Sequence, residues 1–246
     1  ESARAAAFDR VEVLSESADG AALLAEERLS ARRDAINPDR AADLGGSFAG
    51  GDTTYLCAVG SDGWGVSLIQ SNASGFGADI AEPSTGIFLH SRGLGFSLEP
   101  GHPAEYGPRR RPPHTLSPLL VTNPDGSLKA VLGTMGGDGQ PQVLLQLLDR
   151  LLRIGEPVGA AISAPRWILQ AHHQTHGFDT WDGRGAVQVK LEPGCPDTWL
   201  DGLIARGHTA SVAGANYGHA HAIVDHGGVL EGAADPRALT GEAAGF

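Results

Sequence analysis

The sequence changes character abruptly at Thr53, and this change limits the folds that the chain can adopt. Residues 44–52 are rich in glycine and have the composition of a flexible linker. Directly after them, residues 54–59 and 66–71 are two short apolar segments separated by a Ser-Asp-Gly turn, which is the pattern of a β-hairpin. We therefore predict a distinct β-rich unit that begins at Thr53.

The segment before this boundary has the pattern of polar helices. Residues 20–33 place apolar side chains between charged ones, and residues 37–40 predict a turn that leads into another short helix. The segment is too short and too highly charged to form a core of its own. We therefore expect it to pack against another part of the protein.

The chain after Thr53 combines further hairpins with helices. Two more hairpins are predicted, from residues 119–122 with 130–133 and from residues 220–224 with 229–231. Helices are predicted over residues 141–153, 157–164 and 198–206. Residues 72–113 have an irregular pattern, with short strands near residues 86–89. Hairpins and helices in this order indicate a sheet with helices packed on it.

Composition and charge argue against several classes of partner. The formal net charge is −11, and residues 109–111 are the one basic run, so a nucleic-acid partner is not expected. No apolar run is long enough to span a membrane, so no membrane partner is expected either. The histidines near residues 172–176 and 219–226 lack the spacing of a metal-ligand set. We predict neither a metal nor a cofactor.

Thr53 has two interpretations when it is considered alone. A threonine that opens a strand is ordinary, because threonine favours strands, and on this pattern a structural role is favoured. Cleavage at the end of the glycine-rich segment would instead release an α-amino group on Thr53. That amine titrates near about 8, so it can act as a base for the adjacent hydroxyl. One residue would then supply both the nucleophile and the base.

A second candidate is the glycine-rich turn at residues 132–140, between a predicted strand and the clearest helix. Backbone amides at the start of a helix favour negative charge, and Gly136-Gly137 allows a substrate to approach the backbone closely. Such amides suit the oxyanion of a tetrahedral intermediate. A phosphate-binding loop is less favoured, because the Gly-Lys-Ser/Thr ending is absent. By itself the segment is better explained as an ordinary glycine-rich turn between a strand and a helix.

A third candidate is His114, which lies in residues 111–118 directly before a predicted strand. Its imidazole could act as a general base, could donate a hydrogen bond to a substrate, or could be an ordinary loop histidine. In isolation, the residues favour the ordinary loop histidine.

Taken in order, these segments resemble the catalytic small subunit of γ-glutamyltransferases. The matching segments are residues 52–55, 67–72, 75–77, 85–87, 111–118, 135–137, 164–166 and 234–237, and the resemblance extends from about residue 20 to Phe246. It implies an α+β fold, namely the four-layer αββα sandwich of N-terminal-nucleophile hydrolases. It also implies that residues 1–52 are the tail of a large subunit with its linker, that residues 53–246 are the small subunit, and that the rest of the large subunit is a partner.

The resemblance implies a role for each residue of the reaction centre. The precursor would cut itself between Asp52 and Thr53, and Thr53 would be the nucleophile. Ser71 falls where the family has a threonine that hydrogen-bonds the amine of the nucleophile. Gly136 and Gly137 match the glycines of the oxyanion hole.

The residues implied to bind the substrate depart from the family pattern. His114 and Thr115 replace two serines that hold the substrate carboxylate, and Asn72 lies one position from the family's asparagine. Gly95 replaces an acid that pairs with the α-amino group of the substrate, and a buried ammonium without that partner is costly. Arg92 stands where the family usually has an uncharged residue, which favours an acyl group that ends in a carboxylate.

The resemblance therefore predicts an enzyme that acts on small γ-glutamyl or glutaryl amides. The first hypothesis is a γ-glutamyltransferase or γ-glutamyl hydrolase that forms an acyl-enzyme on Thr53. The alternatives are an amidase of the glutaryl or cephalosporin acylase type, and a non-catalytic homologue that serves as a binding scaffold.

Overall fold

The hairpin that begins at Thr53 follows from strict alternation of inward and outward side chains. The computed structural model describes residues 1–7, 9–42, 53–171, 187–214 and 216–246. Strands β1 (Thr53–Val59) and β2 (Gly65–Ser71) pair antiparallel, with Thr53 opposite Ser71. In both strands every second residue is exposed. The predicted hairpin is confirmed, with strand ends within one residue of the sequence pattern.

A four-stranded antiparallel sheet lies beneath this hairpin. Its strand order is β11 (Leu230–Ala234), β10 (Ala220–Asp225), β6 (Leu128–Thr134) and β5 (Leu119–Thr122). The sequence pattern predicted β5–β6 and β10–β11 as two separate hairpins. The structure confirms both and joins them through the pairing of β10 with β6.

Helices cover the other face of this sheet, as predicted. Helix α5 (Gln140–Leu148) and helix α6 (Val158–Ser163) pack on it and enclose a core that includes Leu132, Leu147 and Ile162. The helix predicted over residues 141–153 is α-helical only in its first part, because residues Asp149–Ile154 form a wider π-helical turn, η3. Gly155 then ends it in a left-handed conformation, with φ of +80°.

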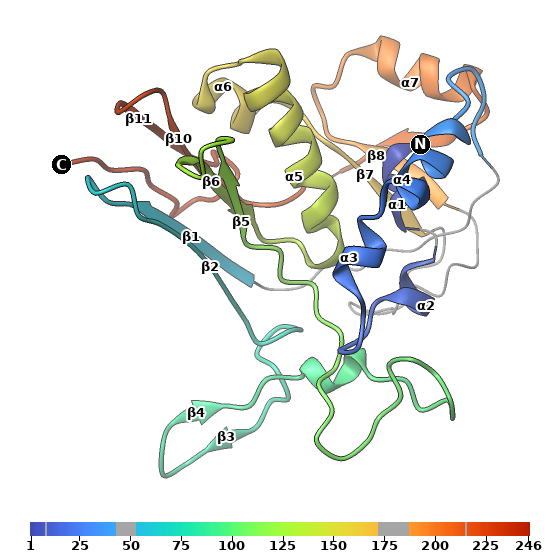
Figure 1. Cartoon of the computed structure of the whole chain (residues 1–246), viewed down its shortest axis with the longest axis vertical. Helices are drawn as coiled ribbons and strands as arrows, with labels where there is room; N and C mark the ends of the chain where they lie inside the picture. The colour runs from blue at the N-terminus through green and yellow to red at the C-terminus, as the bar shows by residue number, and fades with distance from the viewer. Residues whose placement is uncertain (8, 43–52, 172–186, 215) are drawn as a thin grey trace.

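Close contact between the two sheets depends on one glycine. Tyr55 of β1 is buried, and a Cβ atom at Gly133 of β6 would lie 2.1 Å from its ring. The Tyr55 hydroxyl lies 3.0 Å from Ser67 Oγ, and the amide of Leu119 donates to the same oxygen at 3.1 Å. The hairpin, the sheet and the helices thus form three successive layers (Figure 1). The fold is α+β.

A second, smaller core contains strands that the sequence pattern did not predict. Strands β7 (Trp167–Ala171), β8 (Val187–Leu191) and β9 (Thr209–Val212) form a three-stranded sheet, and helix α7 (Asp197–Ala205) packs on it. Helix α7 matches the predicted helix over residues 198–206, ending before Gly207. The alternation of apolar and polar residues in β8 is a strand pattern that the sequence prediction did not use.

A network of buried charges connects the two cores. Arg166 Nη2 lies 2.7 Å from Asp235 Oδ2, and both side chains are almost fully buried. Arg237 Nη2 lies 2.5 Å from Glu192 Oε2, and its Nη1 lies 3.1 Å from Asp235 Oδ1. The two acids are thus shared between two arginines, so no single charge in this group is buried without an opposite partner.

The segment before Thr53 is helical and polar, as expected. It contains α1 (Ser2–Ala7), α2 (Arg10–Val13), α3 (Gly20–Leu23) and α4 (Glu26–Asp34). Asp9 forms ion pairs with Arg28 and Arg32 of α4, which hold the segment together. A short helix was expected after the turn at residues 37–40. This prediction is wrong for the residues up to 42, because residues 37–42 form only bends and irregular chain. The linker at residues 44–52 lies outside the described residues.

Residues 72–113 form an arm that projects from the layered body (Figure 1). The arm contains the two-residue strands β3 (Ala81–Glu82) and β4 (Ile87–Phe88) and the 3-10 turn η1 (Arg92–Gly95). Its mostly irregular structure confirms the sequence expectation. Across the described ranges, no helix has the length and apolar character needed to cross a membrane.

Candidate active site around Thr53

Thr53 and Ser71 face each other at the open end of the β1–β2 hairpin. The Thr53 hydroxyl donates to Ser71 Oγ at 3.0 Å, and the amide of Ala73 donates to the same Ser71 oxygen at 3.0 Å. Both side chains are partly buried. The strand register fixes this contact, because Thr53 and Ser71 are direct cross-strand partners. Two predicted site residues are therefore brought into contact.

A chain of contacts extends from Ser71 to the arm. The carbonyl of Asn72 accepts hydrogen bonds from the amide of Ser91 at 2.8 Å and from Ser91 Oγ at 3.2 Å. Ser91 directly precedes Arg92, whose Nη1 donates to Thr115 Oγ1 at 3.4 Å. Arg92 and Thr115, both predicted to bind the substrate, are thus adjacent. Asn72 contributes its backbone here, and its predicted side-chain role stays a prediction.

His114 is held as the neutral tautomer with its proton on Nε2. The amide of Leu116 donates to His114 Nδ1 at 3.2 Å, so Nδ1 is the acceptor. Loss of solvent around the ring, followed by the positive charges of Arg92 and Arg10, lowers the pKa of His114 below its ordinary value. With Nδ1 as the acceptor, Nε2 carries the proton and is the hydrogen-bond donor of the ring.

The glycine turn requires glycine at both predicted positions. Gly136 has φ of +128° and Gly137 has φ of +54°, which are conformations that side chains rarely adopt. The turn leads into the 3-10 turn η2 (Gly137–Gly139), and the amide of Gly139 donates to the carbonyl of Gly136 at 2.9 Å. Within the described part of the chain, neither the Gly136 amide nor the Gly137 amide donates a hydrogen bond. Gly137 is buried, and the predicted role of these two amides in an oxyanion hole stays a prediction.

An ion pair beside this turn was missed from the sequence. Asp138 directly follows Gly137, is 6% exposed, and forms an ion pair with Arg10 of α2. Burial raises the pKa of Asp138, while the charges of Arg10 and Arg92 act in the opposite direction. The sequence held one usable signal, an acid in the first turn of a helix, which is a favourable position. Its partner lies more than 100 residues away along the chain and could not be identified from spacing.

The absence of a side chain at residue 95 is enforced by packing. A Cβ atom at Gly95 would lie 2.6 Å from the carbonyl oxygen of Pro113 and 3.4 Å from Cβ of Pro112. No side chain fits there without displacement of the backbone that carries His114. The shape of the arm therefore leaves no room at this position for an acidic side chain.

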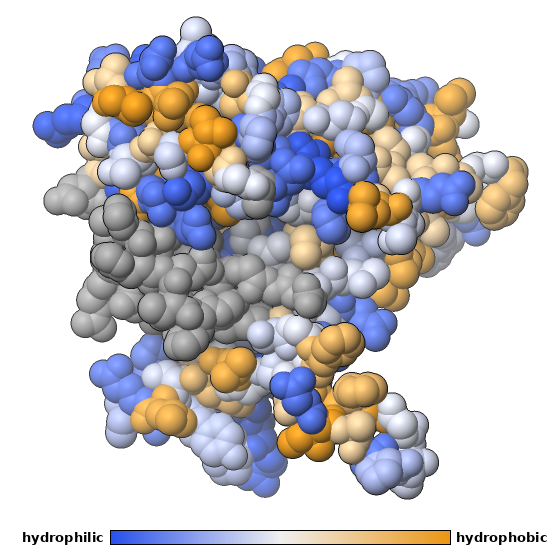
Figure 2. All heavy atoms as spheres, turned by 180° about the vertical axis from the view of Figure 1, so that it is seen from behind, coloured by the Kyte–Doolittle hydropathy of each residue, from blue (hydrophilic) through white to orange (hydrophobic). Residues whose placement is uncertain are grey.

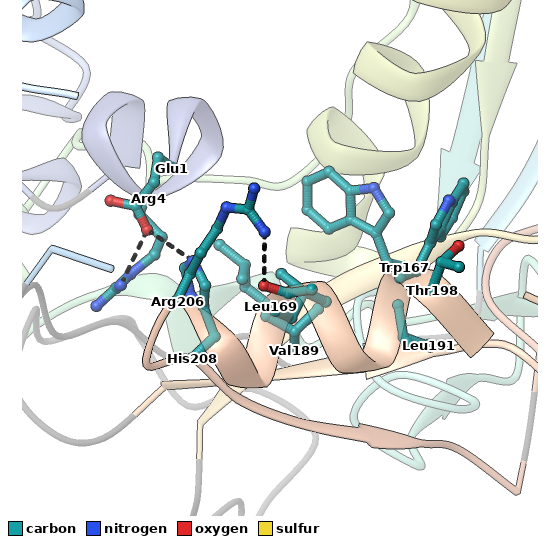
Figure 3. Close-up of a pocket in the computed structure, with 12 residues that line it drawn as sticks. Glu1, Arg4, Trp167, Leu169, Val189, Leu191, Thr198, Arg206 and His208 are labelled. Carbon is teal, nitrogen blue, oxygen red and sulfur yellow. Dashed lines mark hydrogen bonds and ion pairs between the residues drawn. The ribbon is translucent and has the colours of Figure 1, made fainter. Parts of the chain in front are cut away.

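A cavity of about 400 Å³ lies beside Thr53, and its lining does not include Gly136 or Gly137. Thr53 lines this cavity together with Met135, the residue before Gly136, and with His219, His221 and part of the C-terminal tail. A second cavity of about 370 Å³ lies between α7 and the β7–β8 strands and contains none of the predicted site residues (Figure 3). Its walls are mainly apolar, with Glu1, Arg4, Arg206 and His208 at one end. The cavity beside Thr53 is therefore the candidate active site, because a predicted site residue lines it.

Some predicted positions cannot be placed. Asp52 of the predicted cleavage site lies outside the described residues, as do His172, His173 and His176. Within the described ranges, no three histidine, cysteine, aspartate or glutamate side chains are grouped as they would be to hold a metal ion.

Comparison with known proteins places these features in a family context. The family model described as Gamma-glutamyltranspeptidase matches residues 1–245. The chain is 39% identical over 229 residues to the oxamate amidohydrolase proenzyme of Klebsiella pneumoniae, an alignment that covers 91% of this chain and 41% of that protein. It is 38% identical over 193 residues to the glutathione hydrolase-like YwrD proenzyme of Bacillus subtilis, with 76% of this chain and 35% of that protein covered. The chain thus spans about two fifths or less of the length of these relatives.

Solved structures show the same relationship. Cephalosporin acylase from Bacillus halodurans superposes with a TM-score of 0.79 at 31% identity, covering 97% of this chain and 42% of that chain. Gamma-glutamyltranspeptidase from Pseudomonas nitroreducens superposes with a TM-score of 0.61 at 28% identity, covering 78% of this chain and 98% of that chain.

Proposed function

The chain belongs to the gamma-glutamyltranspeptidase family within the N-terminal-nucleophile hydrolases, and from this membership we propose that it is the catalytic part of an amidohydrolase whose nucleophile is Thr53. The observation that carries the proposal is the hydrogen bond from the Thr53 hydroxyl to Ser71 Oγ at 3.0 Å. This contact joins the proposed nucleophile, the first residue of β1, to the residue proposed to bind its amine, the last residue of β2.

The first proposed step is self-cleavage between Asp52 and Thr53. Thr53 Oγ attacks the carbonyl carbon of Asp52, and the bond from that carbon to the Thr53 nitrogen breaks. The nitrogen takes the proton of the hydroxyl, which leaves an ester on Oγ. Water then hydrolyses this ester, releasing the carboxylate of Asp52 and leaving Thr53 with a new α-amino group and its own hydroxyl. The proenzyme names of the relatives support this step.

The second proposed step is acyl transfer through Thr53. The α-amine accepts the proton of the Thr53 hydroxyl as Oγ attacks the carbonyl carbon of the substrate amide. The Gly136 and Gly137 amides hold the resulting oxyanion. The carbon–nitrogen bond breaks, the amine leaves with the proton, and an ester remains on Thr53. Water, or an acceptor amine, attacks this ester, and the acyl group leaves as an acid or as a new amide.

We propose a large subunit from the same precursor as the partner of this part. Residues 53–246 make up 194 of the 246 residues, about four fifths of the chain. The solved gamma-glutamyltranspeptidase chain matches a similar share, 78% of this chain, along 98% of its own length. This agreement supports residues 53–246 as the small subunit and residues 1–52 as the tail of the large one.

Exposed apolar surface supports the same partner. The outward face of the β1–β2 hairpin exposes Leu56, Val66 and Leu68, and the arm exposes Phe76, Ile87 and Phe88. Figure 2 shows apolar side chains gathered on the projecting arm in the lower part of the view. Apolar patches of this kind mark interfaces. In the complete protein we expect further strands and helices to cover the hairpin, which would complete the four-layer αββα sandwich.

The substrate that fits best is a small amide whose acyl group ends in a carboxylate, in the glutaryl class. Gly95 leaves no room for the acid that would pair with an α-amino group, whereas Arg92 is next to Thr115 at the site. A γ-glutamyl group presents both an amine and a carboxylate, so it would bind with its amine unmatched. The cephalosporin acylase likeness supports the same choice.

Mass spectrometry of the full-length protein tests the proposal. We expect two chains, the shorter one beginning at Thr53, and we expect the Thr53→Ala variant to remain a single precursor. Hydrolysis of glutaryl and γ-glutamyl anilides should be measured on the same preparation, with faster release expected from the glutaryl compound. A wild-type protein that remains one chain and hydrolyses neither anilide would favour the non-catalytic scaffold instead.

A further inference from the structure

Arg10 and Asp138 connect the segment before Thr53 to the glycine turn of the active site. Arg10 belongs to α2, and Asp138 is the residue that follows Gly137. The side chains form an ion pair and are 23% and 7% exposed, respectively. An ion pair with one such deeply buried member is screened from water far less than a surface pair.

The turn needs an external contact to define where its amides point. Gly136 and Gly137 both have positive φ, and glycine has more backbone freedom than any other residue. The helix after the turn is held by Gln140, whose side-chain oxygen accepts the amide of Ser117 at 3.0 Å. Among the described residues, Asp138 connects the turn to another segment through its ion pair with Arg10. Gly218 also lies beside the turn, since a carbon added at Gly136 would be 3.9 Å from its Cα. The ion pair is the charged contact that can fix the direction of the Gly137 amide.

Opposite charges favour this contact. Buried Asp138 needs an opposite charge to remain ionised, and Arg10 supplies it from one side. Arg92 of η1 acts on Asp138 electrostatically from the arm. Asp138 is thus within electrostatic range of the substrate-side arginine as well as in contact with Arg10.

We propose that Arg10 is a positioning residue, which holds the Gly136–Gly137 amides in place through its ion pair with Asp138. The inference rests on the proposed oxyanion role of these amides. It has a consequence for the mature protein, because Arg10 lies before the proposed cut while Asp138 lies after it. The tail of the large subunit would then have to stay bound after cleavage, and its contacts support this. The amide of Ala41 donates to the carbonyl of Arg206 at 2.7 Å, and Arg110 lies 3.1 Å from Glu16.

Steady-state kinetics on the full-length protein test the proposal. Arg10→Met keeps the length of the side chain and removes its charge. We expect kcat for a glutaryl anilide to fall about 10- to 100-fold with KM changed less than about twofold, because an oxyanion contact acts mainly in the transition state. Arg10→Lys should recover most of kcat. Arg33→Ala is the matched control, because it removes an exposed arginine that pairs with Glu26 in the same segment, and it should leave both constants unchanged.

A double-mutant cycle separates this role from general loss of structure. Asp138→Asn alone should also lower kcat, and adding it to Arg10→Met should cost little more, because both changes break one contact. Equal kcat in wild type and Arg10→Met, or fully additive losses, would overturn the proposal. If Arg10→Met does not fold, the proposal is tested with Arg10→Lys and Asp138→Asn instead. A normal kcat in Asp138→Asn would also overturn the proposal. If the wild type has no activity, the proposed function fails instead.

Discussion

The hydroxyl of Thr53 donates to Ser71 Oγ across the first cross-strand pair of the β1–β2 hairpin, at a distance of 3.0 Å. The amide of Ala73 donates to the same oxygen, so Ser71 is held by its own loop while it contacts Thr53. A hairpin is a rigid way to fix two side chains, because its register leaves one partner for each residue. The candidate nucleophile is thus positioned by strand pairing rather than by a loop.

Replacing Ser71 tests this arrangement. We expect Ser71→Ala to lower kcat/KM about 10- to 100-fold, since a hydrogen bond to a charged group contributes about 1.5–3 kcal/mol and the proposed α-amine is such a group. Ser71→Thr, which keeps the hydroxyl, should stay near wild type. Ser211→Ala removes a hydroxyl that binds Lys190 in the third sheet and serves as the control. An unchanged rate in Ser71→Ala would remove Ser71 from the reaction centre.

Gly133 tests the contact between the two sheets. In Gly133→Ala the new methyl group would meet the ring of Tyr55 at 2.1 Å, so the hairpin that carries Thr53 must shift. We expect overpacking to cost about 1–3 kcal/mol of stability and to lower activity as well. Thermal unfolding and kcat measure the two effects. Gly159→Ala, in α6 with no atom within 4 Å of the added carbon, should not lower either, and equal behaviour of the two variants would contradict this packing.

The Arg166–Asp235 pair is expected to contribute strongly to stability. Asp235→Asn leaves buried Arg166 without its main partner, and breaking a buried pair costs about 3–5 kcal/mol, which chemical denaturation can measure. Burial alone raises the pKa of Asp235, but Arg166 and the amides of Ala220 and Arg237 lower it below the ordinary value. The contribution is therefore present above the unfolded pKa and is lost as pH falls through the folded pKa.

A matched control exists for this pair on the surface. Asp149 and Arg153 form an exposed ion pair, and Asp149→Asn should leave the denaturation midpoint unchanged. Similar midpoints for the two asparagine variants would show that burial does not determine the strength of the Arg166–Asp235 pair.

The pKa of His114 should depend on the positive charges of Arg92 and Arg10 beside its ring. Loss of solvent around the ring lowers its pKa first, and Arg92 and Arg10 lower it further. We expect an NMR titration to place the His114 pKa below its ordinary value of about 6.5. Arg92→Gln should raise it towards that value, because a positive neighbour is removed. A pKa above 6.5 in the wild type would mean that an acid, rather than an arginine, dominates the surroundings of the ring.

Gly95 tests the choice of substrate. Gly95→Asp restores the acid typical of γ-glutamyltransferases, yet the added carbon would lie 2.6 Å from the carbonyl of Pro113. We expect this variant to lose stability and activity without gaining preference for a γ-glutamyl anilide. Gly93→Asp, where nothing lies within 4 Å of the added carbon, should remain close to wild type in stability. Faster γ-glutamyl release by Gly95→Asp would show that the arm adapts and would reopen the γ-glutamyl assignment.

Local patterns were sufficient for the elements whose signal is contained in a short window. The two apolar segments and the turn of the β1–β2 hairpin and the apolar stripe of α5 could be read directly, and the structure confirms β1, β2 and α5. The β7–β8–β9 sheet was missed, because β8 pairs with β9 across a helix and β7 pairs with β8 across residues 172–186. Pairings across such distances leave little trace in local composition.

By itself, the sequence determined the main hairpins and helices, the hairpin at Thr53 and the family to which the chain belongs, because these depend on residue type and near-neighbour spacing. Only the tertiary structure decided which distant groups meet. It placed Arg10 on Asp138 and Arg92 on Thr115, and it closed the space at Gly95. Such contacts depend on how layers pack and on which charges are removed from water. Thr53 could therefore be proposed from the sequence, whereas the shape and charge of the site around it could not.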